Sequence, residues 1–212
     1  MLVNAGNAVM TSERGTLRNS FAKGPEGWCS YDYHASVVSE RNIFILTTWE
    51  EHGGPENAGY VWTDHTRWSA DTPEIPLSIL PLLFYCSWVN EDPIDLRNAW
   101  VSVYLRGDNL QLDGVNCLFW VHGAVDGVQG RWHLGSRPIA VSEGSWSSEP
   151  VRFALPNDES LWHQSWSQDG QPKQLSQILG AAHSYGFSFT GFSSEVKGRL
   201  SMSQFEIALP QP

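Results

Sequence analysis

Apolar and polar residues alternate with a period of two along most of the chain, from about residue 28 to the C-terminus. Clusters of Gly, Asn, Asp and Pro interrupt the alternation at short intervals, as turns do. Because side chains of a strand point alternately to its two faces, the pattern predicts strands. Ten runs show it: Trp28–His34, Asn42–Trp49, Gly59–Thr63, Leu80–Trp88, Ala99–Arg106, Asn116–His122, Arg131–Leu134, Val151–Leu155, Ser184–Phe189 and Arg199–Leu209. Ten strands suit an all-β sandwich of two antiparallel sheets.

Helical spacing of apolar residues occurs at two short places. Leu175–Ala182 repeats its apolar residues at one-turn spacing and has a glycine near its end, which predicts a short helix. Pro76–Leu80 could form one turn. We therefore expect at most one or two short helices, an N-terminal arm over residues 1–20 and a single sandwich domain over residues 21–212, since no repeat or linker divides the chain.

Three consecutive runs, Ala99–Arg106, Asn116–His122 and Arg131–Leu134, show the alternation most clearly. The connectors Gly107–Asn109 and Gly123–Gly127 hold residues that tolerate positive φ, which is typical of hairpins. We expect these three runs to be neighbours in one antiparallel sheet.

Charge and cysteine content limit the partners. The formal net charge is −10 although only 17% of residues are charged, which argues against nucleic acid and anionic membranes as partners.

The three cysteines form no CxxC pair and lie in apolar runs, so we expect buried thiols. The first thirty residues lack a signal-peptide pattern, and no run is as long as a membrane span. We expect a cytoplasmic protein or a secreted one without its leader, and the pattern indicates no oligomeric state.

Tryptophan is the most unusual component, with 11 residues beside 19 glycines and 12 prolines. Sandwich cores consume aromatic residues, and we expect the core to hold at least half of them. Flat rings also cover the apolar C–H face of a sugar, which could account for three or four.

Four short motifs give the chain a family resemblance. They are Phe21 with Gly24–Trp28, the glycine-rich Gly53–Tyr60 followed by Asp64, Trp146 ahead of the Val151 strand, and the closing Gly198–Ile207. Their order resembles the laminin domain IV module and related bacterial carbohydrate-binding jelly rolls. The resemblance implies a sandwich of jelly-roll type and a carbohydrate ligand.

A structural calcium is common in such modules, where an Asp of the last strand helps to hold it. Ser203 or Gln204 stands at that place in this chain, which leaves the ion in question. We therefore expect no cofactor.

The first candidate site is the outward face of the three central runs. Alternation places six polar or aromatic side chains on that face: Tyr104, Arg106, Trp120, His122, Arg131 and His133. Such groups hydrogen-bond sugar hydroxyls, and an arginine can also pair with a carboxylate. The alternative is a solvated sheet face with ordinary cross-strand pairs.

Two further groups of residues could bind a ligand. Tyr60, Trp62 and Asp64 follow the glycine-rich loop, with His65, Arg67 and Trp68 after them, although Trp68 could simply close the core. Trp162 and Trp166 lie four residues apart in a polar segment and could flank a groove or pin a long connection to the sandwich.

Catalytic motifs are scarce. A glycoside hydrolase needs two carboxylates about the scissile bond, and the acidic residues here are scattered. A β-elimination lyase needs a Tyr or His to move protons and an Arg to neutralise a uronate, and Tyr104, His122 and His133 could supply the acid and base. None of the seven histidines forms a metal-binding pattern such as HxH or HExxH, so we expect no metal site.

The sequence thus predicts a non-catalytic carbohydrate-binding domain. A polysaccharide-degrading enzyme that uses Tyr, His and Arg on the same face is the alternative, and a protein-interaction domain is a third hypothesis.

Overall fold

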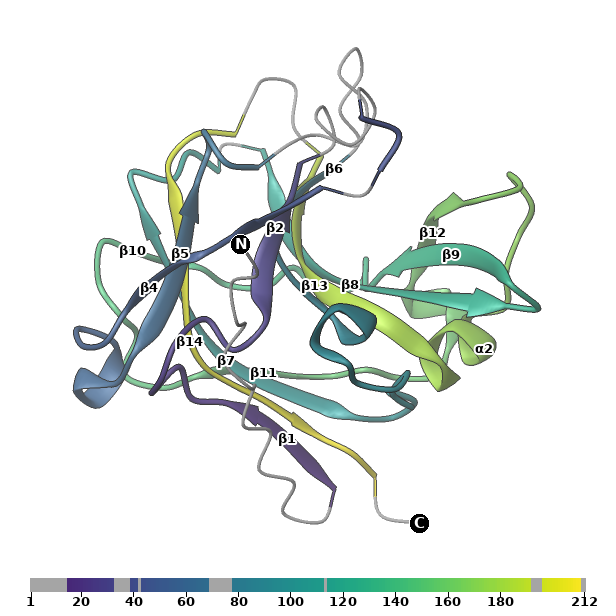
Figure 1. Cartoon of the computed structure of the whole chain (residues 1–212), viewed down its shortest axis with the longest axis horizontal. Helices are drawn as coiled ribbons and strands as arrows, with labels where there is room; N and C mark the ends of the chain where they lie inside the picture. Colours follow the sequence, from purple (N-terminus) through teal and green to yellow (C-terminus); the bar gives the residue numbers. More distant parts are fainter. Residues whose placement is uncertain are drawn as a thin grey trace.

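The computed structural model describes residues 15–32, 39–41, 43–68, 78–112, 114–191 and 196–210. They form two sheets of seven strands each, packed face to face around one core (Figure 1). Nearly all neighbouring strands are antiparallel, and one short α-helix lies among the described residues. The predicted all-β sandwich is confirmed.

The first sheet, called sheet A here, follows the order β10-β7-β14-β5-β4. Two further strands pair with its members, β1 with β14 and β11 with β7, and only the pairing of β10 with β7 is parallel within this sheet. The bounds are β1 Thr16–Asn19, β4 Thr48–Glu50, β5 Tyr60–Asp64, β7 Trp100–Asp108, β10 Ser142–Glu143, β11 Val151–Ala154 and β14 Arg199–Ala208.

The second sheet, sheet B, follows the order β12-β9-β8-β13-β6-β2-β3 and is antiparallel throughout. Its bounds are β2 Trp28–Tyr31, β3 Phe44–Leu46, β6 Ser78–Tyr85, β8 Asn116–Val125, β9 Val128–His133, β12 His163–Ser167 and β13 Ala182–Thr190. Figure 1 shows that β8 and β13, at its centre, are strongly curved.

The core lies between the two sheets and is rich in aromatic side chains. Trp28 of sheet B is fully buried, and its ring centroid lies 4.7 Å from that of Phe205 of sheet A. Phe84, Tyr185 and Phe187 surround the same ring at centroid distances of 6.0 to 6.4 Å. All three cysteines are buried free thiols, as expected, and burial raises their pKa values.

Helical segments are short. The predicted helix is confirmed as α2, Leu175–Gly180, which buries three apolar side chains, Leu175, Ile178 and Leu179. The described residues also include three 3-10 turns: η1 Pro55–Asn57, η2 Cys86–Val89 and η3 Glu159–Leu161. The turn predicted at 76–80 is wrong for Ser78–Leu80, which belong to β6, while Pro76 lies outside the described residues. None of the described helices has the length and apolar character needed to cross a membrane.

The prediction that the three central runs share one sheet is wrong. β8 and β9 are neighbours in sheet B, joined by a tight hairpin at Asp126–Gly127, where both residues have positive φ. β7 lies in sheet A instead, between β14 and the β10 and β11 strands. The segment after Gly107–Asn109 therefore crosses from one sheet to the other and does not form a hairpin.

The run Asn42–Trp49 also divides between the sheets. Thr47 separates β3 from β4, and the two short strands pair in sheet B and sheet A respectively. Three strands without a clear alternation, β1, β10 and β12, were not predicted. The division into an arm and a domain stays a prediction, and residues 16–19 of that arm form β1 against β14.

Candidate functional site

The ten predicted site residues lie on two opposite surfaces and in the core. In each sheet, the outer face is the one turned away from the other sheet. The outer face of sheet A carries Tyr60, Trp62, Asp64, Tyr104 and Arg106, and that of sheet B carries Trp120, His122, Arg131 and His133. Trp162 is buried at 6% exposure and donates its Nε1 hydrogen to the Pro156 carbonyl oxygen. A single site made of both groups is therefore excluded, because the core separates them.

Guanidinium groups cover the rings on the outer face of sheet A. Arg199 places its Cζ 3.7 Å from the centre of the Trp62 ring, and Arg67 lies at 4.9 Å from the same ring. Arg106 is 5.4 Å from the Tyr60 ring centre. Cation–π contacts of this kind contribute about 0.5–2 kcal/mol each, so a ligand would have to displace them to stack on the rings.

The polar groups of this face also bind one another. Arg106 pairs with Asp108 at 3.0 Å, and Trp62 donates its Nε1 hydrogen to Glu50 Oε1 at 3.2 Å. Desolvation, with smaller contributions from Glu149 and Glu56, raises the pKa of Tyr104. Around Tyr60, Trp62 and Arg106, the outer face of sheet A is thus a network closed on itself.

The outer face of sheet B carries a different arrangement, a row of paired residues from five adjacent strands. Tyr85 of β6 lies opposite Ser184 of β13, and Ser184 lies opposite His122 of β8. His122 pairs with Arg131 of β9, and Arg131 pairs with Trp166 of β12. We call these five residues the polar row. Since strands are spaced by about 4.8 Å, the row is roughly 19 Å long.

Aromatic rings stand at both ends of the polar row. Trp166 at one end is 43% exposed, and its ring centroid lies 5.9 Å from that of His122 in a tilted contact. At the other end Tyr85 stacks on Phe44 with centroids 5.4 Å apart, and Phe44 stacks on Trp88 at 5.3 Å. Trp88, from η2, is 40% exposed.

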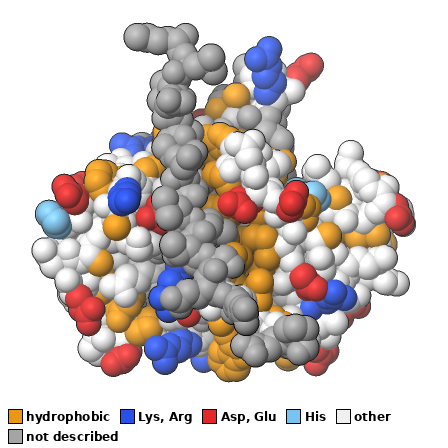
Figure 2. Space-filling view, turned by 60° about the horizontal axis from the view of Figure 1, so that its bottom comes forward, with side chains coloured by type: hydrophobic (Ala, Val, Ile, Leu, Met, Phe, Trp, Pro, Cys, Tyr) orange, Lys and Arg blue, Asp and Glu red, His pale blue; other side chains and the backbone are white. Residues whose placement is uncertain are grey.

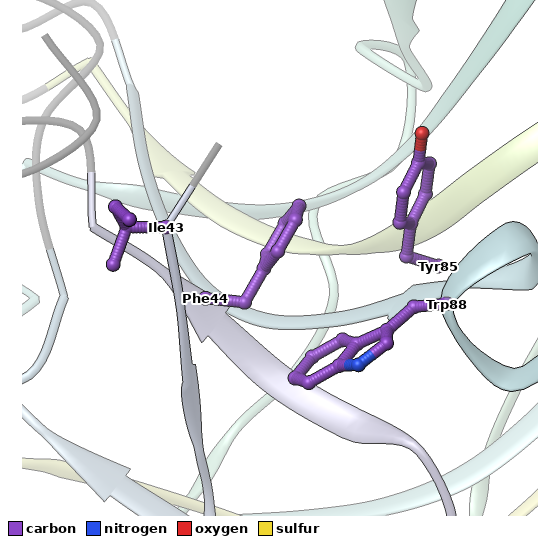
Figure 3. A pocket seen from close by; sticks show the side chains of 4 residues that line it. All are labelled: Ile43, Phe44, Tyr85 and Trp88. Atoms are coloured by element: carbon purple, nitrogen blue, oxygen red, sulfur yellow. The ribbon is translucent and has the colours of Figure 1, made fainter. Parts of the chain in front are cut away.

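A hollow of about 460 Å³ lies at the Tyr85 end of the polar row. Four side chains line it (Figure 3): Ile43, which directly precedes β3, Phe44 of β3, Tyr85 of β6 and Trp88 of η2. The hollow is mainly apolar, and it shares Tyr85 with the polar row.

Hydrogen bonds hold the middle of the polar row. His122 Nδ1 lies 3.2 Å from Ser184 Oγ, and Arg131 donates its Nε hydrogen to Ser165 Oγ at 3.1 Å. Arg131 is only 8% exposed. Its guanidinium therefore acts from below the surface, whereas the rings at the two ends face solvent.

Beside the polar row runs a second row that is buried and has a structural role. Trp120 pairs with His133, and Trp120 is 2% exposed within a small apolar cluster with Cys29, Leu80 and Leu83. His133 is fully buried, and its Nε2 lies 2.6 Å from Ser188 Oγ. Replacing Trp120 would therefore damage the fold, which makes it unsuitable as a test of binding.

The predicted acid–base set is not assembled. Tyr104 lies on sheet A, while His122 and His133 lie on sheet B. The three side chains cannot act on one bond. Among the described residues, no group of three or more His, Cys, Asp and Glu side chains is arranged to hold a metal ion.

Burial keeps His122 neutral. Desolvation, assisted by the charge of Arg131 and by His183, lowers the pKa of His122 to about 4. Desolvation also lowers the pKa of His133 well below its usual value and lowers that of His163. At neutral pH these imidazoles are uncharged and each can both donate and accept a hydrogen bond.

We expect the protein to lose stability as the pH falls from 7 to 5. Above about pH 6.5, His122 is neutral in both states and contributes no pH dependence. Between about pH 6.5 and 4, the unfolded chain binds a proton that the folded chain does not, so the free energy of unfolding falls by about 1.4 kcal/mol per pH unit. By pH 5 His122 alone accounts for about 2 kcal/mol, and His133 and His163 act in the same direction.

Guanidinium denaturation at pH 7 and pH 5 measures this loss. His122→Gln should reduce the difference between the two pH values, whereas His52→Gln should leave it unchanged because His52 is exposed. An equal difference in the two variants would contradict the account of His122.

Charged side chains give no single dominant patch on the face shown in Figure 2. Acidic and basic groups are scattered over it, and hydrophobic side chains gather near its middle. The described side chains of this face form no extended basic surface.

Some residues of this face were not predicted as site residues. Phe44, Tyr85, Trp88 and Ser184 were missed. Tyr85 had a usable signal, since it alternates with Leu82 and Phe84, which point into the core. Trp88 had none, because the predicted strand Leu80–Trp88 is wrong beyond Tyr85, where β6 ends and η2 sets the direction of the tryptophan.

Comparisons with known proteins give distant likenesses only. No protein-family model and no curated protein matches the chain. Among solved structures, it resembles an exo-β-agarase with a TM-score of 0.49 and 11% sequence identity, and the match covers 91% of this chain and 24% of the agarase. It resembles PfGH50B with a TM-score of 0.41 and 7% identity, and the match covers 78% of this chain and 22% of that one. It also resembles CBM28, a carbohydrate-binding module specific for non-crystalline cellulose, with a TM-score of 0.39 and 11% identity over 86% of this chain and 87% of the module.

The chain spans less than a quarter of the length of the first two structures. At TM-scores below 0.5, none of the three likenesses decides what this chain binds. A laminin domain is not among these three, so that part of the resemblance stays a prediction.

Proposed function

We propose that the chain binds an oligosaccharide or polysaccharide across the outer face of sheet B, along the polar row. The observation that carries the proposal is the row itself, in which a ring at each end, Tyr85 and Trp166, flanks hydrogen-bonding side chains from the three strands between them. Its length of roughly 19 Å suits several linked sugar residues.

The rings supply the surface on which a sugar ring can lie. The C–H groups of a pyranose are apolar, and a flat aromatic ring covers them without competing for its hydroxyls. Trp166 and Trp88 are each about two-fifths exposed, so ring surface is accessible at the two ends. Apolar contact and a few placed polar groups are the usual composition of a small-molecule site.

The groups between the rings supply direction. His122 is half-buried, and its neutral imidazole can both donate and accept a hydrogen bond without the desolvation cost of a charge. Ser184 is 4% exposed and positions the imidazole through its contact with Nδ1. Sugar hydroxyls have the same dual capacity. The match favours a neutral polar ligand, and the formal net charge of −10 disfavours an anionic one.

Sheet A offers the weaker surface for the same ligand. The Trp62 and Tyr60 rings are covered by Arg199 and Arg106, whose displacement would cost the cation–π contacts. We therefore propose that Trp166 and Trp88, in place of Trp62, stack on the sugar.

Trp166→Ala should weaken saccharide binding by about tenfold or more. Removing an exposed ring that contacts a ligand commonly costs about 1–2 kcal/mol, and tenfold corresponds to about 1.4 kcal/mol. A panel of neutral and acidic polysaccharides screened by affinity electrophoresis identifies the ligand. Calorimetry with its oligosaccharides then gives the dissociation constants.

Trp100→Ala is the matched control. Trp100 is 55% exposed on sheet A, so the same substitution there should leave affinity unchanged. Circular dichroism should show both variants folded. If the two variants bind equally well, the polar row is not the binding surface.

A further inference from the structure

The hollow at the Tyr85 end of the polar row has a lining that differs chemically from the side chains of the row. The side chains of Ile43 and Phe44 offer only C–H groups. The side-chain polar atoms of its lining are Tyr85 Oη and Trp88 Nε1, and the structure gives neither a hydrogen-bond partner among the residues it describes. In Figure 3 the Tyr85 hydroxyl stands at the tip of its ring, away from the Phe44 ring.

The stacked rings form one apolar wall in this hollow. Phe44 lies between Tyr85 and Trp88, and the interplanar angles are 27° and 28°. The volume of about 460 Å³ falls in the range of small-molecule pockets, about 300–1,000 Å³. The hollow is therefore large enough for a sugar residue and not only for a single group.

A hydroxymethyl group placed against this wall would be poorly satisfied. On the side turned to the wall, its hydroxyl would lose water and meet the side chains of Ile43 and Phe44, which can neither donate nor accept a hydrogen bond. A methyl group at the same position would bury apolar surface without leaving a polar atom unpaired. The hydroxyls of the ring could still meet Tyr85 Oη and Trp88 Nε1 at the edges.

We infer that this hollow takes a 6-deoxyhexose, a sugar residue with a methyl group where common hexoses carry hydroxymethyl. The inference rests on the proposed function, because Tyr85 belongs to both the hollow and the polar row. It adds the class of sugar that stands at one end of the ligand.

Two matched pairs of methyl glycosides test the inference. L-fucose differs from L-galactose, and L-rhamnose from L-mannose, by one hydroxyl on C6. Dissociation constants from protein-observed NMR titration should be about tenfold lower for the 6-deoxy member of at least one pair. An enclosed apolar pocket discriminates against one added hydroxyl by about 100-fold, and this hollow is open on one side.

Variants locate the discrimination. Phe44→Ser should bring the ratio of the two dissociation constants close to one, and Ile43→Thr provides the same test if the first variant fails to fold. Trp166→Ala should leave the ratio unchanged, because Trp166 lies at the opposite end of the polar row. Loss of the ratio in Trp166→Ala would contradict the assignment to the hollow.

The other outcomes separate this inference from the proposed function. Equal or tighter binding of the hydroxymethyl sugars overturns the 6-deoxy assignment and leaves the polar row intact. Phenyl glycosides that bind tightly whatever their sugar would assign the hollow to an apolar aglycone and would also overturn it. If polysaccharides bind but none of the monosaccharides does, the hollow is not a sugar subsite. Failure of every saccharide to bind contradicts the proposed function itself.

Discussion

Trp28→Ala should lower the free energy of unfolding by about 4 kcal/mol or more. Truncating a buried Trp to Ala typically costs about 3–5 kcal/mol, because the contacts of the ring are lost and a cavity remains. Trp28 is fully buried and touches both sheets, with Phe205 on one side and Phe84, Tyr185 and Phe187 on the other.

The indole nitrogen adds to the effect of this substitution. Trp28 Nε1 donates to Asn19 Oδ1 at 3.0 Å, and Asn19 is 2% exposed. Without the indole, a buried amide oxygen loses its donor, which costs about 1–3 kcal/mol. Domains of this kind are stable by about 5–15 kcal/mol in total, so the variant should be close to unfolding at 37 °C.

Denaturant unfolding monitored by circular dichroism measures the effect, with Trp100→Ala as the control. Trp100 is 55% exposed, so its loss should change the free energy of unfolding by less than about 1 kcal/mol. If Trp28→Ala and Trp100→Ala lower the free energy of unfolding by amounts that agree within about 1 kcal/mol, Trp28 does not join the two sheets as described.

Gly186→Ala should cost about 3 kcal/mol or more. A Cβ atom at Gly186 would collide with the backbone of β6, at the Leu82 carbonyl oxygen, and would lie 2.8 Å from Leu83 Cα. Gly186 sits in β13 between β6 and β8, so neither neighbour can retreat without breaking ladder hydrogen bonds. Overpacking usually costs about 1–3 kcal/mol, and a backbone obstacle places this site at the upper end or beyond.

Gly180→Ala is the matched control for this substitution. Its Cβ would meet only the side chain of Arg97, at 3.3 Å, and that flexible side chain can move. The cost should stay within about 1 kcal/mol. If the two glycine variants unfold at the same denaturant concentration, the close approach of β13 to β6 is not as tight as the structure has it.

The strands could be predicted where one face of a sheet is buried and the other is not. In β7, Val101, Val103 and Leu105 alternate with polar or aromatic residues, and the structure buries those three side chains. The alternation identifies which side chains face the core. It does not say which of the two sheets a strand joins, because both sheets turn one face to the same core.

That ambiguity explains why the predicted site divided into two. Tyr104 and Arg106 point outward from sheet A, and Trp120 and His122 point outward from sheet B, with identical sequence patterns. Only the pairing partners distinguish them, and these are set by segments far apart in the chain: β7 pairs with β14, and β8 with β13.

The alternation of apolar and polar residues also did not predict which single aromatic side chains are buried. Trp162 and Trp166 lie four residues apart in one polar segment, yet Trp162 packs into the core and Trp166 faces solvent. A bulge in β12 between Gln164 and Trp166 shifts the register and helps to turn Trp166 toward the polar row. The residue types in this segment do not predict the bulge.

The two outer faces also differ in a way that matters for function. On sheet A, each of the rings Trp62 and Tyr60 has an arginine as its neighbour. On sheet B, the rings at the ends of the polar row meet other rings and solvent. A count of aromatic residues in the sequence treats both faces alike, whereas the contacts distinguish rings covered by arginine from rings that face solvent.

A crystal structure with the tightest-binding oligosaccharide of the panel tests the central claim most directly. The account predicts that the sugar lies across β6, β13, β8, β9 and β12, with ring contacts to Trp166 and to Tyr85 or Trp88. A sugar seated over Tyr60 and Trp62 on sheet A, with sheet B unoccupied, would contradict it.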